Sequence, residues 1–594
     1  MTGEPRTILK DVFGFDAFRG VQEDVVARVM RGDHTLAVMP TGAGKSLCYQ
    51  LPALAREGTA LVISPLIALM HDQIRSADAM GIRAASLTSA DGDRERTIDR
   101  FRSGELDLLY VAPERATTEG FRRLLDRERL ALIAIDEAHC VSEWGHDFRP
   151  DYRQLRDLLN HHHDTPRLAL TATADARTRA DILAQLGISE DGLIVAGFDR
   201  PNIRYHVLPR DGIGGQIKHL LGRVSGPGIV YAPSRDKAER IAEQIAGTGR
   251  SALPYHAGLE PQVRARNQSA FVASEEMVMA ATVAFGMGID KPDVRLVAHA
   301  AIPKSIEAYY QETGRAGRDG DPAEAWLFWS AEDFALARRR IETELEPERR
   351  TGERERLNTL AAFVEATGCR RAILLRHFGE DPPESCGNCD NCLDPPASID
   401  ATEVARKLLS AAFRTEMRFG VAHLAEVLAG KDSEKVRSFG HDRLSVFGIA
   451  SADEVALVRP VARALIARDA LRADAYGGLS FGPAARPILK GEQALSIAVP
   501  PPRRRTSRRR DEGPSDPIFE ALRAARRAIA TEAGVPPYVV FHDSTLRGIA
   551  EVRPRNLAEL ARIQGVGAAK LERYGDVMLA AVAAQEESGD APAA

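Results

Sequence analysis

A segment near the amino terminus has the residue types and spacing of a phosphate-binding loop. It reads Pro40-Thr41-Gly42-Ala43-Gly44-Lys45-Ser46, follows an apolar run at 35–38 typical of a buried strand, and leads into a predicted helix. In such a strand–turn–helix unit, backbone N–H groups and the positive end of the helix dipole face the bound phosphates. Gly42 and Gly44 allow backbone angles that a Cβ would hinder. We expect Lys45 to contact the β- and γ-phosphates of a nucleotide and the Ser46 hydroxyl to ligate Mg²⁺.

Two carboxylates follow the most apolar segment of the chain. Asp136 and Glu137 come directly after residues 131–135, which predict a buried strand. The carboxyl end of a central strand is where an α/β sheet places its ligand. Asp136 can hold Mg²⁺ directly or through water, and Glu137 can polarise an attacking water. This pair therefore predicts hydrolysis of the nucleotide.

Two arginines lie between glycines in a later segment, Gly314-Arg315-Ala316-Gly317-Arg318. Arginines at this spacing are unusual in a plain loop. They suit stabilisation of the charge that develops during phosphoryl transfer, supplied from a neighbouring domain. We therefore expect Arg315 and Arg318 to complete the nucleotide site.

Aromatic residues follow the acidic pair in a polar loop at 140–150. Trp144 and Phe148 suit either a small hydrophobic core or stacking on nucleic-acid bases. Their position directly after the acidic pair favours a loop that couples a second ligand to hydrolysis.

Four of the six cysteines cluster late in the chain. Cys369 is followed by Cys386, Cys389 and Cys392 at C-x-x-C-x-x-C spacing. Four thiolates can surround a tetrahedral ion and favour Zn²⁺ in a closed structural site. An iron–sulfur cluster uses the same ligand type and is the alternative. Arg370, Arg371, Arg376 and His377 make the adjoining predicted helices locally basic.

Composition sets limits on the class of protein. The chain has 594 residues, of which 44% are hydrophobic and 27% charged, as expected for a globular protein of about four domains. The net charge of −5 means that any nucleic-acid surface must be a local patch. No apolar run is long enough to span a bilayer, and the first residues lack the features of a signal peptide. We therefore expect a cytoplasmic protein.

Short apolar runs alternate with helical stretches in two successive sets, the second beginning near residue 200. This alternation predicts an α/β fold with parallel sheets. The further predicted strands are 61–64, 108–111, 168–173, 228–231 and 277–282.

The order and spacing of these motifs resemble superfamily 2 helicases, and specifically the bacterial RecQ family. The similarity extends from about residue 10 to 585, and the departure from the strict phosphate-loop pattern at Met39 is one that RecQ-like loops share. The motifs are Phe18-Arg19 with Gln22, the phosphate loop, Asp136-Glu137-Ala138-His139 with its aromatic loop, Thr171-Ala172-Thr173, and Gln311 to Arg318.

The resemblance implies a domain order. It consists of two RecA-like lobes at 1–200 and 201–335, a zinc-binding helical subdomain at 336–398, a winged helix at 399–495, a Pro/Arg-rich linker at 496–514, a helical HRDC domain at 515–585 and a disordered tail at 586–594. The linker suits either a solvated tether or non-specific phosphate contact. In the HRDC domain, 565–567 suits either a phosphate contact or a tight turn.

The resemblance also implies roles for individual residues. Gln22 suits the edge of adenine, whereas without the resemblance its residue type favours a polar surface position. Tyr476 lies in a predicted hairpin turn of the winged helix and suits either a wedge at the duplex junction or packing on the wing. The implied nucleotide contacts are Arg19, Gln22, Thr41, Gly42, Gly44, Lys45, Ser46 and Asp290, and the implied DNA contacts are Trp144, Phe148, Arg149 and Tyr476.

The resemblance implies ATP-driven unwinding of duplex DNA with 3′-to-5′ movement, using ATP, Mg²⁺ and Zn²⁺. Its implied partners are single- and double-stranded DNA, single-stranded DNA-binding protein and recombination or repair proteins, at the nucleoid. Two alternatives are an ATPase that moves along DNA without separating strands, and a DNA-binding scaffold that has lost ATPase activity. The intact Lys45, Asp136, Glu137 and Arg318 argue against the scaffold.

Overall fold

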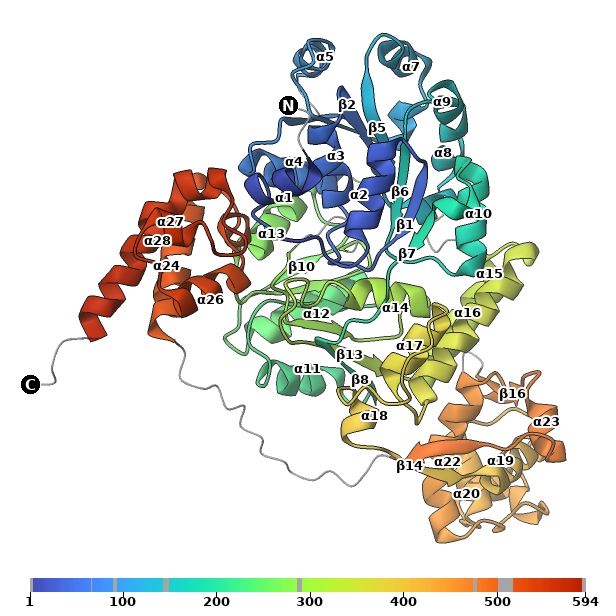
Figure 1. The fold of residues 1–594 in the computed structure, drawn as a ribbon. Helices are drawn as coiled ribbons and strands as arrows, with labels where there is room; N and C mark the ends of the chain where they lie inside the picture. The colour runs from blue at the N-terminus through green and yellow to red at the C-terminus, as the bar shows by residue number, and fades with distance from the viewer. Residues whose placement is uncertain are drawn as a thin grey trace, which may run out of the picture.

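The protein folds into two α/β lobes followed by three smaller units, as the computed structural model shows (Figure 1). The structure describes residues 4–589 except 66, 89–92, 143–148, 286–290, 474–477 and 500–515. The predicted α/β class with two parallel sheets is confirmed. No helix in the described part of the chain is long and apolar enough to cross a membrane.

The first lobe is a parallel sheet of seven strands in the order β3-β4-β2-β5-β6-β1-β7. Side chains of alternate strand residues pack into separate cores on the two faces, so the strands are apolar throughout. The strands are β1 (Thr35–Val38), β2 (Thr59–Ile63), β3 (Ala84–Leu87), β4 (Leu108–Val111), β5 (Leu130–Ile135), β6 (Arg167–Thr171) and β7 (Leu193–Val195). One face carries α1 (Pro5–Asp11), α2 (Gln22–Arg31), α3 (Leu47–Ala55) and α4 (Ile67–Ala79), and the other includes α7 (Glu119–Leu125), α9 (Leu155–His161) and α10 (Ala176–Leu186).

The second lobe is a parallel sheet of six strands in the order β10-β11-β9-β12-β13-β8. Its strands are β8 (Ile203–Pro209), β9 (Gly228–Tyr231), β10 (Ala252–Tyr255), β11 (Val278–Ala281), β12 (Leu296–His299) and β13 (Ala323–Trp329). Helices α11 (Ile213–Leu221) and α12 (Arg235–Ala246) cover one face, and α13 (Pro261–Ala273) and α14 (Ile306–Thr313) cover the other. Because every strand is parallel to its neighbours, all carboxyl ends share one edge, where ligands of such sheets bind.

A helical region and a small mixed domain follow. The helical region contains α15 (Ala331–Glu344), α16 (Pro347–Glu365), α17 (Arg370–His377) and α18 (Asp390–Leu393). The mixed domain contains β14 (Ala397–Asp400), α19 (Thr402–Arg414), α20 (Val421–Leu428), α21 (Glu434–Ser438), α22 (Ala452–Ala467), β15 (Leu471–Ala473), β16 (Leu479–Phe481), α23 (Ala485–Lys490) and β17 (Ser496–Val499). Strands β14 and β17 pair antiparallel and close this domain, so it extends beyond the predicted 399–495 on both sides.

The last domain is a helical unit with its own hydrophobic core. It comprises α24 (Pro517–Ala533), α25 (Pro537–Val540), α26 (Asp543–Val552), α27 (Leu557–Leu560) and α28 (Ala568–Gly589). Helix α28 continues past residue 585, where the sequence predicted a disordered tail to begin.

This helical unit docks on both lobes (Figure 1). Arg526 forms an ion pair of 2.7 Å with Glu275 of the second lobe. The backbone N–H of Gly565 donates to the carbonyl oxygen of Gly14 in the first lobe at 2.9 Å. The 565–567 segment is therefore a turn between helices, with one N–H bound to the first lobe.

Candidate active site

The phosphate loop joins β1 to α3, as its sequence predicts. Gly42 and Gly44 adopt φ values of +86° and +73°, in the left-handed region that favours glycine. The Lys45 ammonium donates to the carbonyl oxygens of Met39 at 3.2 Å and Pro40 at 3.4 Å. The positive charge of Lys45 is therefore held close to the loop whose N–H groups can receive phosphate.

Gln22 connects the start of α2 to this loop and is only 4% exposed. Its Oε1 accepts the backbone N–H of Arg19 at 2.9 Å, and its Nε2 donates to the carbonyls of Ala43 at 2.9 Å and Gly44 at 3.2 Å. The Gln22 side chain thus connects the backbone before α2 to the backbone of the phosphate loop. A contact between Gln22 and adenine stays a prediction.

The acidic pair lies directly beyond β5, and its backbone is unusual. Glu137 has a φ of +49°, which is uncommon for a residue with a side chain. Its N–H donates to Oδ1 of Asp136 at 2.9 Å, and the Tyr152 hydroxyl donates to the Asp136 carbonyl at 3.0 Å. The surroundings therefore hold Glu137 in a conformation that costs energy, as is common at catalytic sites.

His139 joins the acidic pair to the end of β6. Its Nδ1 lies 3.0 Å from the Thr171 hydroxyl and 3.4 Å from a carboxylate oxygen of Glu137. Since β6 lies between β5 and β1, Thr171 is placed between the acidic pair and the phosphate loop. Burial, reinforced by the charges of Lys45 and Arg149, lowers the pKa of His139 to about 3. The imidazole is therefore neutral at physiological pH.

This neutral histidine should make the fold sensitive to acid. The unfolded chain binds a proton at His139 below about pH 6.5, whereas the folded state does so only near pH 3. Stability should therefore be full above pH 6.5 and fall on acidification, by about 1.4 kcal/mol per pH unit well below 6.5. Urea unfolding at about pH 7.5 and about pH 5 checks this expectation. Between the two pH values, the free energy of unfolding should fall less for His139→Asn than for the wild type. An equal fall in the free energy of unfolding for both proteins would contradict a lowered pKa of His139 in the folded state.

The two predicted arginines have different surroundings. Arg318 lies against the phosphate loop, since a Cβ added to Gly42 would lie 3.3 Å from its Cγ. Arg315 is 5% exposed and interacts with the hydroxyl of Tyr231 inside the second lobe. The backbone and the first side-chain carbons of Arg318 therefore lie against the phosphate loop of the first lobe.

Sequence reasoning missed a residue between the lobes. Arg200, in the segment that joins β7 to β8, donates to the carbonyl oxygens of Thr41 at 2.6 Å and Gly314 at 3.2 Å. It thereby bridges the phosphate loop and the loop of the second lobe that carries Arg318. The only signal in the sequence is a basic residue before Pro201 at the boundary between the two α/β sets.

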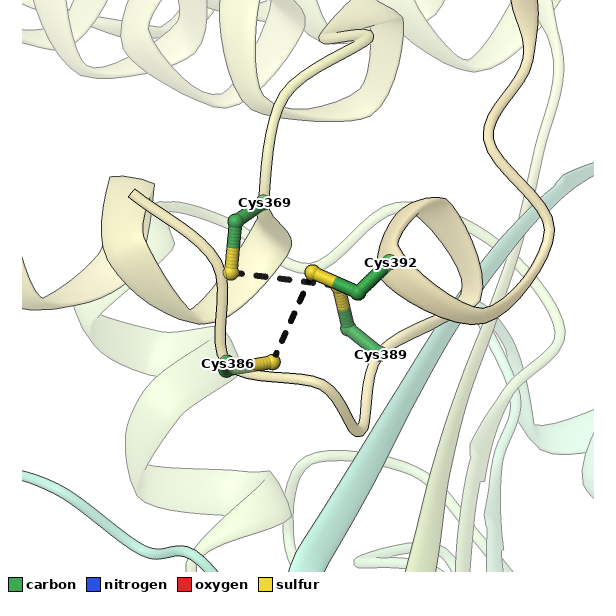
Figure 2. Close-up of side chains that lie close together, drawn as sticks. All are labelled: Cys369, Cys386, Cys389 and Cys392. Atoms are coloured by element: carbon green, nitrogen blue, oxygen red, sulfur yellow. Dashed lines mark hydrogen bonds between the residues drawn. The ribbon is translucent and has the colours of Figure 1, made fainter. Parts of the chain in front are cut away.

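The four clustered cysteines converge on one point (Figure 2). Their Sγ atoms all lie within 4.8 Å of one another, and the pairs Cys386–Cys392 and Cys369–Cys389 are each 3.9 Å apart. Zinc bound tetrahedrally at about 2.3 Å from each sulfur separates the sulfurs by about 3.8 Å. Burial raises the pKa of Cys389, so a thiolate there needs a cation beside it. The residues fit Zn²⁺.

This cysteine centre is part of the second lobe. Cys369 and Cys389 belong to the same hydrophobic core as the second sheet. Asp390 accepts the N–H of Val207 at 2.8 Å and thereby gives a partner to one backbone donor on the outer edge of strand β8.

Two of the basic residues in the helix beside this centre lie inside the fold. Arg370 and Arg371 are buried. Arg370 donates to the Phe363 carbonyl at 2.6 Å, and Arg371 donates to the Ile203 carbonyl at 2.8 Å. Carbonyl groups inside the fold therefore accept from both guanidinium groups.

Four predicted site residues lie outside the described residues: Trp144, Phe148, Asp290 and Tyr476. Their roles stay predictions. Arg149, at the end of the aromatic loop, donates its N–H to the Cys140 carbonyl at 2.9 Å and its Nη1 to the Pro65 carbonyl at 3.2 Å. It thus ties the loop to the segment after β2.

Family models match five successive parts of the chain. They are the DEAD/DEAH box helicase model at 19–182, the helicase conserved C-terminal domain at 216–320, the RecQ zinc-binding model at 331–393, the RQC domain at 395–506 and the HRDC domain at 515–582.

Curated relatives resemble the chain over almost its whole length. The chain is 42% identical over 582 residues to an ATP-dependent DNA helicase RecQ from Pasteurella multocida, a match that covers 96% of this chain and 92% of the relative. It is 41% identical to a protein of the same name from Haemophilus influenzae, with coverage of 97% and 95%. It is 39% identical to one from Bacillus subtilis, with coverage of 99% and 100%.

Proposed function

The chain belongs to the RecQ family of ATP-dependent DNA helicases, and on that premise we propose that its lobes couple ATP hydrolysis to 3′-to-5′ movement along one DNA strand. This movement separates the duplex. ATP, Mg²⁺ and Zn²⁺ are its cofactors, and DNA is its partner.

One observation carries the proposal. Arg318 of the second lobe packs on Gly42 of the phosphate loop, so the chemistry of hydrolysis is divided between two lobes. A change in the contact between the lobes then alters catalysis, and nucleotide exchange can in turn move the lobes. This coupling is what a motor requires.

The side chains take the following roles in this mechanism. Lys45 holds the β- and γ-phosphates, and Glu137 orients the attacking water. Arg318 neutralises charge on the transferring group, and Arg315 supports it from inside the second lobe. When bound, Mg²⁺ neutralises phosphate charge, and its proposed ligands are Ser46 and Asp136. Zinc is proposed to be held by Cys369, Cys386, Cys389 and Cys392.

Remaining assignments rest on the family resemblance. Arg19, Gln22, Thr41, Gly42, Gly44 and Asp290 are proposed to contact the nucleotide. Trp144, Phe148, Arg149 and Tyr476 are proposed to contact DNA.

We also propose domain limits, partners and location on this basis. The limits near residues 200, 335 and 515 separate the lobes, the zinc region and the HRDC domain. Single-stranded DNA-binding protein and recombination or repair proteins are proposed partners at the nucleoid.

Strand separation on a forked duplex tests the function. Purified protein should release the labelled strand with ATP and Mg²⁺ and should not do so when ATP is omitted. Hydrolysis without strand release would favour movement along DNA without unwinding. DNA binding without hydrolysis would indicate a scaffold.

Trp144 provides a test of coupling to DNA. Trp144→Ala should reduce the stimulation of ATP hydrolysis by single-stranded DNA, because a stacking contact worth about 1–3 kcal/mol is lost. The measurement is the ratio of stimulated to unstimulated rate, with thermal melting recorded on the same preparation. A lowered melting temperature with an unchanged ratio would assign Trp144 to a hydrophobic core.

A further inference from the structure

Arg200 lies between the phosphate loop and the loop of residues 314–318, which we call the finger loop. Each of its two terminal nitrogens donates twice, so the four terminal N–H bonds of the guanidinium are all used. The acceptors are the carbonyl oxygens of Thr41 at 2.6 Å, Gly314 at 3.2 Å, Ala316 at 2.8 Å and Gly317 at 2.9 Å. Such a set of bonds fixes both the position and the plane of the side chain.

Arg200 stands in the segment that joins the two lobes, and only one of these four bonds is made to the first lobe. Thr41 belongs to the phosphate loop, and the other three acceptors belong to the second lobe. The two loops also touch directly, since a Cβ added to Gly314 would lie 3.3 Å from Cβ of Thr41. If Arg200 moves with the second lobe, to which it makes three of its four bonds, rotation of one lobe against the other changes the Arg200–Thr41 contact while those three bonds persist.

The finger loop places Arg318 directly after the residues that Arg200 holds. The Gly317 carbonyl accepts from Arg200, and the next residue, Arg318, packs on Gly42. A guanidinium group bonded to both loops thus helps to set the distance between the phosphate loop and the Arg318 backbone.

We propose that Arg200 is a positioning residue for ATP hydrolysis, which fixes the finger loop, and with it Arg318, relative to the phosphate loop. It acts through backbone carbonyls. The inference rests on the proposed function, because it assumes that ATP is hydrolysed between the lobes.

The physical chemistry predicts what each substitution does. A displacement of about 1 Å in a catalytic group can lower a rate by about 10²-fold. Nucleotide affinity should change little, because Lys45 and the loop N–H groups that bind phosphate remain. Lysine cannot replace Arg200, since its three donors sit on one nitrogen and cannot match four carbonyls in a plane.

The test is the steady-state ATPase of the full-length protein with single-stranded DNA. Arg200→Ala and Arg200→Lys should each lower kcat by about 10²-fold, while KM for ATP and the affinity for a fluorescent ADP change far less. Free guanidinium ion, well below denaturing concentration, should restore part of kcat in Arg200→Ala. It should give no such gain in Arg200→Lys, where the lysine side chain fills the site, or in the wild type.

Asn202→Ala is the matched control. Asn202 donates at 2.8 Å to both the Gly317 and the Asp321 carbonyls within the second lobe, and among the described residues its side chain makes no hydrogen bond to the phosphate loop. It should lower kcat less than Arg200→Ala does, because the bonds of Arg200 to both loops remain.

Two results would overturn the inference. One is a kcat near the wild-type value in Arg200→Ala. The other is a loss of kcat that matches Asn202→Ala and does not respond to guanidinium. A wild-type protein without ATPase activity would overturn the proposed function, and this inference with it, so the two failures are distinguishable.

Discussion

Replacing Arg318 with alanine should lower kcat for ATP hydrolysis by about 10³–10⁵-fold, the effect of an arginine finger in related phosphoryl transfers. Arg318 packs on Gly42 of the phosphate loop, where its charge can act on the transferring phosphoryl group. Nucleotide binding should persist, because the loop backbone and Lys45 are unchanged. Single-turnover hydrolysis and ADP affinity, measured together, check this result.

Arg315→Ala is the control for this effect. Arg315 is buried beside Tyr231, whose pKa burial raises to about 12 despite the nearby arginine charge. Arg315→Ala should lower the thermal stability of the second lobe more than Arg318→Ala does. It should lower kcat less than Arg318→Ala does. If Arg318→Ala hydrolyses ATP normally while Arg315→Ala does not, the finger role belongs to Arg315.

Removal of the metal should unfold the cysteine centre and weaken the second lobe with it. In zinc-finger peptides, zinc binding contributes about 10–16 kcal/mol of folding free energy at pH 7. Cys369 and Cys389 share a hydrophobic core with the second sheet, so the loss reaches beyond the metal ligands. Cys389→Ser should therefore lower the melting temperature of the second lobe, and ATP hydrolysis should fall together with DNA binding.

Elemental analysis decides which metal is present. We expect one zinc per chain and no iron, because four sulfurs at this separation match a single tetrahedral ion. Visible absorption typical of an iron–sulfur cluster would contradict this expectation. Unchanged melting of Cys389→Ser would show that the centre does not stabilise the lobe. Ser385→Ala, which removes a hydroxyl 3.2 Å from the Cys392 sulfur but no ligand, is the matched control.

The sequence predicted the sites that are built from contiguous residues. The strand at 35–38 and the turn at 40–46 stand next to each other in the chain, so their geometry follows from local propensity and from glycine. The strands at 108–111 and 228–231 were equally predictable, because both of their faces are buried and the sequence is apolar throughout. The spacing of the cysteines similarly restricts them to one metal site.

The tertiary structure alone decided how distant segments meet. In the sequence, Arg200 and Arg370 carry no signal of their partners, and Arg315 and Arg318 are expected alike to complete the nucleotide site. The fold buries Arg370 among carbonyl groups, places Arg315 inside the second lobe, sets Arg318 on the phosphate loop, and makes Arg200 a bridge between lobes. An arginine side chain has the same donors in every case. Which acceptors it reaches depends on the packing of two sheets, and that packing is a property of the whole chain.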